Sequence, residues 1–405
     1  MKKLMILNGS LLQVPLIRAA KEEGYYTIVC DRTATNPGIQ LADKHYQLSV
    51  LDFDAVMKAA LKEHIDGIIS NYENSMSIVA KISELLHLQG NPELAVKRIE
   101  SKYKFREVLQ AANLFSPEAF ESEDVEEFCE KVQKLTFPVI VKPSNSSASR
   151  GITVFENYGE QQIRDCFDSC QKLSLDHKVT AENYVEARDA AFFEGEIFVF
   201  DGKAYDFGMF TCLRSKKFPL YPQCDVYPPL LSREESVTIK EQLYAICREA
   251  GYKYGVINVE GFIEKNGEPF FIEINARQGG GDNPLLIQDC CNVDMYKLLV
   301  TTAMNDSYYY EQVIEQLTGN YDTGPYINVF AVFSCREGLY RGLHIDDDVK
   351  EYIYAIEELH TVNTHIDRAK HSGDRVAKVR LRFPNREQQL RYTDILENKI
   401  YAEAE

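Results

Sequence analysis

The stretch FFIEINARQGGGDNP, residues 270–284, alternates apolar and polar side chains and then runs into three glycines. In a β-strand, alternate side chains share one face of the sheet. One face of this strand would therefore be apolar and could pack on a core. The other face would carry a carboxylate, an amide and a guanidinium in a row, from Glu273, Asn275 and Arg277.

The preceding stretch, GVINVEGFIEKNGEP (residues 255–269), supplies the partner strand. Its Asn266-Gly267 pair is typical of a two-residue type I′ hairpin turn. Counting back from that turn pairs Glu260 with Glu273 and Asn258 with Asn275 on one face. The same register places four apolar residues together on the opposite face: Val259, Ile263, Ile272 and Ile274.

Two carboxylates opposite each other in a sheet repel, and one of them would normally be protonated. A bound cation removes this conflict. Carboxylate and amide oxygens are hard ligands that suit Mg²⁺ held partly by substrate phosphates, and Mn²⁺ could replace it. We therefore predict a metal site at Glu260, Glu273 and Asn275; the alternative is a solvated strand face.

Composition narrows the class of protein. The chain has 405 residues, which predicts two or three domains, and a formal net charge of −17, which disfavours a nucleic acid partner. Its ten cysteines form no CxxC pair, and no run of eighteen apolar residues is present. Because we also find no signal peptide pattern at the start, we expect a cytoplasmic protein without a membrane partner.

The order of elements predicts a chain of mixed α/β and α+β class. Residues 1–95 alternate strand and helix patterns, which favours a parallel sheet covered by helices. Residues 96–305 open with a helical stretch at 96–112 and continue with strands of an antiparallel sheet. Residues 306–405 return to strands and turns, which predicts a smaller β-rich C-terminal subdomain.

The E-x-N-x-R strand, with a second glutamate on its partner, resembles the ATP-grasp superfamily. The resemblance implies an ATP-grasp fold with a pre-ATP-grasp N-terminal domain and a lid subdomain at about 113–190. It implies that Glu260, Glu273 and Asn275 bind Mg²⁺–ATP. It also implies that Arg277 is the catalytic cation, which stabilises an acyl phosphate and the oxyanion formed when an amine attacks it.

Two further segments resemble parts of the family that contact phosphates. Lys142 ends the apolar strand FPVIVK and precedes the loop SNSSASRG, whose small residues could close over phosphates. We predict that Ser146, Ser147 and Gly151 belong to this loop contact, although the family loop is usually richer in glycine. Lys102 lies one helical turn before Arg106, and the resemblance implies that Lys102 contacts phosphates; a solvated helix face explains this pair equally well.

AENYVEARD, residues 181–189, resembles the family segment that holds adenine. The resemblance implies that Glu182 accepts from the adenine amino group and that the backbone at Tyr184 and Val185 reads the ring edge. Asp189 would lie nearby, where the family usually has glutamate. Without the resemblance, an edge strand with two acids explains this segment.

The glycine-rich turn makes Gly280, Gly281 and Asp282 candidates for substrate recognition, and a purely structural turn is equally compatible. In the first domain, Gly9 has no second glycine until Gly24, so a dinucleotide fingerprint is absent. Glu73 and Asn74 follow a strand end at the edge of the expected site; we favour a helix cap for them.

The resemblance implies an ATP- and Mg²⁺-dependent ligase, which activates a carboxylate as an acyl phosphate for attack by an amine. Its substrates would be small molecules, and a homodimer is compatible with it. One alternative is a carbamoyl-phosphate-synthase-like or purine-pathway enzyme. The alternative from another class is a regulatory protein that binds the nucleotide without turnover.

Overall fold

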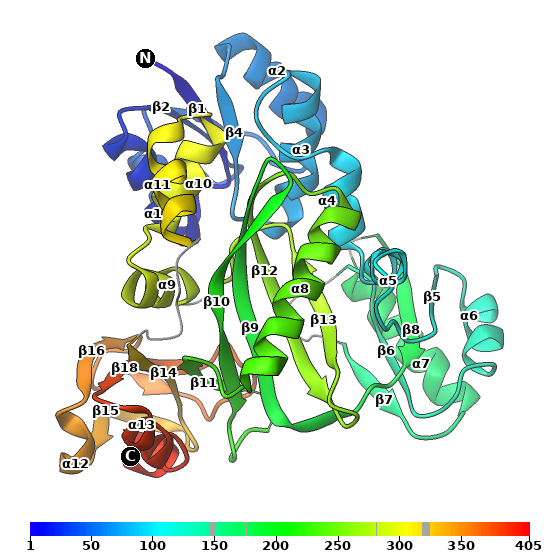
Figure 1. Cartoon of the computed structure of the whole chain (residues 1–405), viewed down its shortest axis with the longest axis vertical. Helices are drawn as coiled ribbons and strands as arrows, with labels where there is room; N and C mark the ends of the chain where they lie inside the picture. Colours follow the sequence, from blue (N-terminus) through cyan, green and yellow to red (C-terminus); the bar gives the residue numbers. More distant parts are fainter. Residues whose placement is uncertain (146–150, 175, 220, 281, 318–324) are drawn as a thin grey trace.

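The computed structural model describes residues 1–145, 151–174, 176–219, 221–280, 282–317 and 325–405 (Figure 1). Its N-terminal domain is built on a parallel sheet, as the alternation of strands and helices predicts. Leu4 and Ile6 of its central strand pack in one core, whereas Met5 and Leu7 pack in the core on the opposite face. The elements of this domain are β3 (Lys44–Tyr46), β2 (Tyr26–Cys30), β1 (Lys3–Leu7) and β4 (Gly67–Ile69), in sheet order, with η1 (Leu11–Gln13), α1 (Val14–Glu22), η2 (Pro37–Gln40), α2 (Phe53–Glu63), η3 (Glu73–Ser75) and α3 (Met76–Leu85).

The single helical stretch expected at 96–112 is instead two helices, α4 (Glu93–Glu100) and α5 (Lys102–Ala111). The break falls at Ser101, which has extended backbone and accepts a hydrogen bond from the backbone N–H of Lys104. Serine is a favoured N-cap because its hydroxyl satisfies an otherwise unpaired helical N–H. The cap places Lys102 in the first residue of a new helix.

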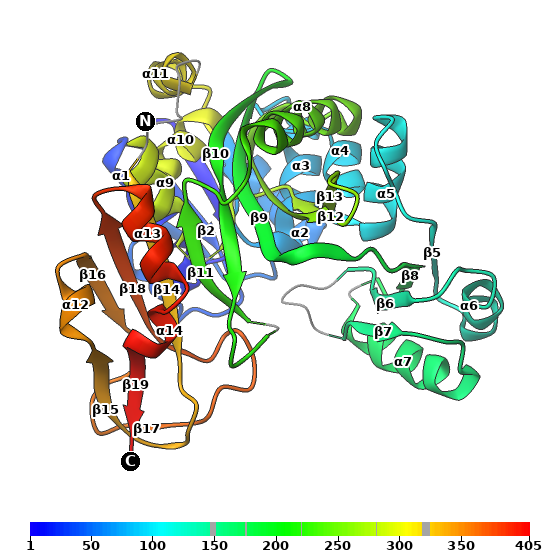
Figure 2. The same ribbon diagram turned by 60° about the horizontal axis from the view of Figure 1, so that its bottom comes forward.

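A separate four-stranded unit occupies most of the expected lid range and stands away from the central sheet (Figure 2). Helices α6 and α7 pack on it around Phe128 and Phe167, which are both buried. In sheet order its strands are β5 (Ala119–Ser122), β8 (Val179–Asn183), β6 (Val139–Pro143) and β7 (Thr153–Phe155), and its helices are α6 (Val125–Val132) and α7 (Glu160–Leu173).

The central sheet is antiparallel, as expected, and its eight strands cross the boundary predicted at residue 305. In sheet order they are β13 (Pro269–Asn275), β12 (Tyr254–Glu264), β9 (Ala187–Phe200), β10 (Lys203–Arg214), β11 (Pro222–Tyr227), β14 (Tyr326–Phe333), β18 (Arg375–Phe383) and β16 (Ile353–Glu358). Because β14, β18 and β16 continue the sheet that holds the carboxylate hairpin, C-terminal side chains can face the same cleft as the hairpin.

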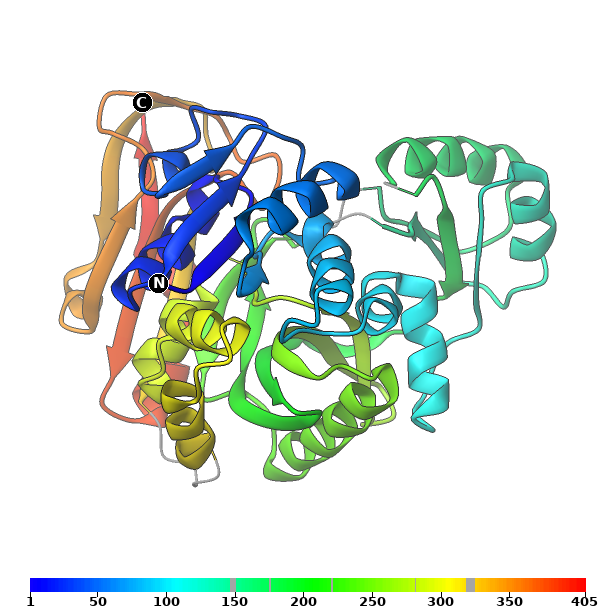
Figure 3. The same cartoon turned by 90° about the horizontal axis from the view of Figure 1, so that it is seen from above.

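Helices cover the central sheet and connect it to the first domain. Helix α8 (Arg233–Ala250) packs on it through Ile239, Leu243 and Ile246. Three further helices, α9 (Asn283–Cys291), α10 (Met295–Ala303) and α11 (Ser307–Leu317), follow the hairpin. Helices α10 and α11 share a core with α1 of the N-terminal domain (Figure 3).

The remaining C-terminal elements pack beside β14 and β18 around Tyr340 and Leu396. They are β15 (Gly338–Ile345), α12 (Asp347–Lys350), β17 (His365–Ile366), α13 (Arg386–Thr393), α14 (Leu396–Lys399) and β19 (Ile400–Ala404). Among the described residues, no helix is both long enough and apolar enough to cross a membrane.

Candidate active site

The carboxylate hairpin has the predicted register at the site but a different turn. Glu260 pairs with Glu273 and Asn258 pairs with Asn275, as predicted. Nearer the turn the register shifts by one residue, because the loop holds three residues in place of two. Within that loop only Gly267, at φ +93°, has a left-handed backbone. A type I′ turn needs positive φ at both central residues, so that prediction is wrong.

A β-bulge at Ile272 restores the register before the carboxylates are reached. The extra residue also changes the apolar face, since Phe271, and not Ile272, packs in the core with Ile274. The prediction that Ile272 joins that face is therefore wrong. The bulge frees the carbonyl oxygens of Phe271 and Ile272, and Arg106 donates to both at 3.0 Å.

A third carboxylate extends the predicted pair. Glu194 on β9 is the register partner of Glu260, so Glu194, Glu260 and Glu273 lie side by side across three strands. Burial, together with the charges of Glu194 and Glu273, raises the pKa of Glu260 to about 8. Such crowding of carboxylates is relieved by a bound cation, and the paired Glu260 and Glu273 carboxylates fit a divalent metal.

Lys102 lies beside the same row, and its ammonium is 3.0 Å from the Glu273 carboxylate. Burial opposes the charged form of both groups. Their mutual attraction outweighs burial, so the pKa of Glu273 is held below and that of Lys102 above the ordinary value. The contact excludes the interpretation of Lys102 as part of a solvated helix face.

Lys142 and Arg106 both bind Glu182 in a buried triad. Arg106 donates to Glu182 at 2.8 and 3.3 Å, and Lys142 donates to the same carboxylate. Burial is the largest influence on Lys142, lowering its pKa to about 8; the two cations outweigh burial at Glu182 and lower its pKa to about 2. Two cations and one carboxylate leave a net positive charge when all are ionised, and this charge suits a phosphate group.

The adenine contact of Glu182 stays a prediction. Both oxygens of its carboxylate already accept hydrogen bonds, from Arg106 and Lys142.

Arg277 is held by the N-terminal domain. Its guanidinium donates to Glu73 at 2.5 Å and to the carbonyl oxygen of Gln278 at 2.9 Å. The helix-cap interpretation of Glu73 is wrong, because Tyr72 is the N-cap residue of η3 and Glu73 follows it. Asn74 donates to the hydroxyl of Tyr72 at 3.0 Å. The ion pair links the first domain to the end of β13.

Sequence reasoning missed Glu196, which fixes the glycine-rich loop. Its buried carboxylate accepts from the backbone N–H of Gly279 at 2.7 Å and from Asn283 and Asn258 at 3.2 Å. A Cβ on Gly279 would lie 2.4 Å from this carboxylate, so glycine is required there. The alternation in FEGEIF, residues 193–198, indicates that Glu194 and Glu196 share one strand face. It does not reveal the partners of these two residues, which lie far away in sequence.

The carboxylate row opens into a cleft of about 540 Å³ that the C-terminal strands complete. Gly280 and Asp282, two of the predicted substrate residues, line it. Asp282 is buried and accepts from Lys378 at 3.0 Å and from Arg380 at 3.4 Å. Gly281, the third, lies outside the described residues.

The other predicted nucleotide residues lie on the lid and at its junction with the central sheet. Tyr184 and Val185 line a separate hollow of about 410 Å³ next to the β12–β13 loop. Asp189 is exposed and accepts from the backbone N–H of Ala191 at 2.8 Å. Gly151, at φ +74°, lies against Pro143 and Leu173. Two predicted loop residues, Ser146 and Ser147, lie outside the described residues.

Comparisons with known proteins agree with this geometry. A family model described as the ATP-binding domain of the carbamoyl-phosphate synthase L chain matches residues 101–280, and a PylC-like N-terminal domain model matches residues 5–91. The carbamoyl phosphate synthase large chain of Vibrio vulnificus (strain CMCP6) is 24% identical over 273 residues, which is 64% of this chain and 24% of that protein. The chain thus spans about a quarter of the length of the curated relatives it matches.

Solved structures match the whole chain. An L-amino acid ligase from Bacillus licheniformis superposes with a TM-score of 0.78 at 17% identity, covering 100% of this chain and 99% of that one. The biotin carboxylase domain of the Hydrogenobacter thermophilus 2-oxoglutarate carboxylase, crystallised with MgADP and bicarbonate, gives 0.70 at 18% identity, covering 100% and 91%. The fold is therefore that of the ATP-grasp proteins. The family model places an ATP-binding domain of the ATP-grasp type in residues 101–280.

Proposed function

We propose that this protein is an ATP- and Mg²⁺-dependent ligase that joins a carboxylate to an amine and releases ADP and phosphate. The observation that carries the proposal is the row of Glu194, Glu260 and Glu273 with Lys102 and Arg277 at its edge. The three carboxylates and Arg277 line one cleft, and Lys102 pairs with Glu273 beside it. A metal–polyphosphate complex has the charges that such a site complements.

The residues divide between the two parts of that complex. Glu260, Glu273 and Asn275 supply oxygen ligands for the metal, which neutralises phosphate charge when bound. Lys102 and Lys142 supply cations for the phosphate oxygens, and Lys142 brings the net positive charge of its triad. The MgADP named for the biotin carboxylase domain supports this division. Mn²⁺ satisfies the same oxygen ligands.

In the reaction, a carboxylate oxygen of the first substrate attacks the γ-phosphorus of ATP, and the bond to the ADP oxygen breaks. The amine nitrogen, in its unprotonated form, then attacks the acyl carbon. Phosphate leaves with the electrons of the C–O bond, and the nitrogen gives up one proton to the solvent. Arg277 faces the cleft and carries a fixed positive fork, so it stabilises the acyl phosphate and the negative charge that develops on the carbonyl oxygen. Positioning and electrostatics supply the catalysis, and no protein nucleophile is required.

The test is Mg²⁺-dependent ADP release from the purified full chain, screened with pooled carboxylates and pooled amines. Glu273→Gln keeps the shape of the side chain and removes its charge, so it is the matched control. We expect release above background with at least one pool and none from the variant. ATP-dependent thermal stabilisation without release from any pool would favour the regulatory nucleotide-binding alternative. Release with bicarbonate as the sole carboxylate would favour the carbamoyl-phosphate-synthase-like alternative.

A further inference from the structure

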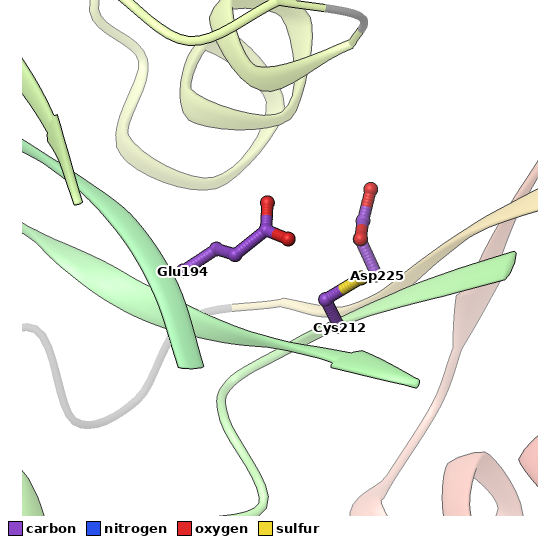
Figure 4. Close-up of side chains that lie close together, drawn as sticks. All are labelled: Glu194, Cys212 and Asp225. Carbon is purple, nitrogen blue, oxygen red and sulfur yellow. The ribbon is translucent and has the colours of Figure 1, made fainter. Parts of the chain in front are cut away.

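One wall of the cleft carries two carboxyl groups, Glu194 and Asp225, to which the proposed function assigns neither metal nor phosphate. Asp225 on β11 joins Glu194 across the intervening strand, and their ligand atoms lie within 4.8 Å of each other and of the Cys212 thiol. Figure 4 shows the two carboxyl groups on the same side of the sheet, with the thiol beside Asp225. Neither carboxyl group forms an ion pair with any other described residue. They can therefore receive a positively charged ligand.

The same cleft carries two guanidinium groups that are also unused. Arg214 lies with its guanidinium carbon 4.4 Å from the ring centre of Phe192, and Arg375 begins β18. Both side chains line the cleft. Within the described parts of the chain, neither guanidinium group forms a hydrogen bond or an ion pair. A β-bulge at Val376 turns Arg375 to the face that Lys378 occupies. The lysine, in contrast, is already neutralised by Asp282.

Asp282 adds a buried acceptor to this end of the cleft. Its side chain is 5% exposed, and its Oδ1 takes the bonds from Lys378 and Arg380. Its Oδ2 has no hydrogen-bond partner among the described residues. A buried carboxylate oxygen without a donor is costly in a folded protein, so a donor from a ligand would be stabilising.

We propose that this end of the cleft binds the amine substrate as a zwitterion. The ammonium lies against Asp225 and Glu194, and an acidic group of the same molecule pairs with Arg375 and Arg214. The inference rests on the proposed function, because it names the class of molecule that supplies the nitrogen. An α-amino acid and a small phosphorylated amine share this chemistry, with a carboxylate or a phosphate as the acidic group.

A metal ion is the competing occupant of the carboxyl groups, and the arginines beside them oppose it. The two guanidinium groups line the same cleft, and a metal ion alone would leave their charges unpaired. An ammonium needs only hydrogen-bond acceptors, and its attached acidic group accounts for the arginines.

The experiment uses the full chain and separates formation of the acyl phosphate from attack by the amine substrate, with hydroxylamine as the probe. Hydroxylamine is largely uncharged at neutral pH and carries no acidic group, so it captures an acyl phosphate as a hydroxamate without using the proposed subsite. The carboxylate found in this way is then held fixed. ADP release is measured with a pool of α-amino acids, with the matching amino acid amides, and with O-phosphoethanolamine.

We expect the amino acids or O-phosphoethanolamine to be used well and the amides poorly, because the amides lack the acidic group. The better of the two zwitterions identifies the acidic group. Arg375→Met and Asp225→Asn should each raise the KM for that amine by about tenfold or more, since each removes one charged contact. Both variants should form hydroxamate at close to the wild-type rate. Arg382→Met removes a cation from the same strand outside the cleft and should change neither assay.

Two results would overturn the inference. One is that the amides serve as well as the amino acids. The other is that either cleft variant loses hydroxamate formation as severely as it loses ligation, while its melting temperature matches the wild type. The residue would then act in forming the acyl phosphate and not in binding the amine. Absence of hydroxamate from the wild-type protein with every carboxylate is a different result, and it would refute the proposed ligase function itself.

Discussion

Arg106 joins the lid to the carboxylate hairpin, so Arg106→Met should weaken the fold sharply. The side chain donates two hydrogen bonds to Glu182 and two to the bulge carbonyls of Phe271 and Ile272, and it is 2% exposed. Removing one partner of a buried ion pair costs at least about 3 kcal/mol of unfolding free energy. The lower value applies here because Glu182 keeps its ion pair with Lys142. The two carbonyl groups that lose their donor add about 1 kcal/mol each, which brings the expected loss of unfolding free energy to about 5 kcal/mol.

Urea unfolding followed by far-ultraviolet circular dichroism measures this loss, because the chain contains no tryptophan for fluorescence. Arg106→Lys retains the charge but cannot reach the carboxylate and both carbonyl groups together, so about half of the loss should remain. Adding Glu182→Gln to Arg106→Met should cost less than the sum of the single changes, since the two residues interact. If Arg106→Met unfolded within about 1 kcal/mol of the wild type, the proposed role of the triad would be wrong.

Three further predictions concern Arg277, the glycine-rich loop and pH. Arg277→Ala should retain ATP-dependent thermal stabilisation and lose turnover by about 10²-fold or more. Glu73→Gln should lower turnover by a smaller factor, because it only releases the arginine from its ion pair. Equal turnover in Arg277→Ala and the wild type would refute the catalytic role of Arg277. Gly279→Ala should lower the melting temperature by several degrees, whereas Gly280→Ala, with no atom near an added Cβ, should not; similar melting temperatures for the two variants would contradict the packing argument. Burial raises the pKa of Glu196 from 4.5 to about 8, so the stability contributed by its protonated form is present at acidic pH and lost as pH rises through about 8. Glu196→Gln should therefore melt above the wild type at alkaline pH and close to it near pH 5, and an unchanged difference across this range would count against the assignment.

Much of the site could be predicted from local sequence because the hairpin is local. Asn266-Gly267 located the loop, and strand alternation then placed Glu260 opposite Glu273. The predicted turn type was wrong, and the bulge at Ile272 compensated for it. Whether a bulge forms depends on what accepts the released carbonyl groups, here Arg106, which no pattern within the hairpin reveals.

The rest of the site depends on contacts between distant segments. Lys142 and Glu182 are each recognisable from their own motifs, but their pairing with Arg106 follows from how the lid packs on α5. Glu73 meets Arg277 across 204 residues. Arg375 enters the cleft only because β18 continues the central sheet, whereas strand patterns past residue 305 predicted a separate subdomain.

The transfer of oxygen from carboxylate to phosphate tests the central proposal most directly. The wild-type chain would be given ATP, Mg²⁺, an amine and the carboxylate found in the screen, labelled with ¹⁸O in its carboxyl group. Attack of the amine on the acyl carbon breaks the C–O bond and leaves one carboxyl oxygen on the phosphate. Each ligation should therefore release phosphate with one ¹⁸O atom, detected by mass spectrometry. Phosphate released without the label during ligation would contradict carboxylate activation at this site.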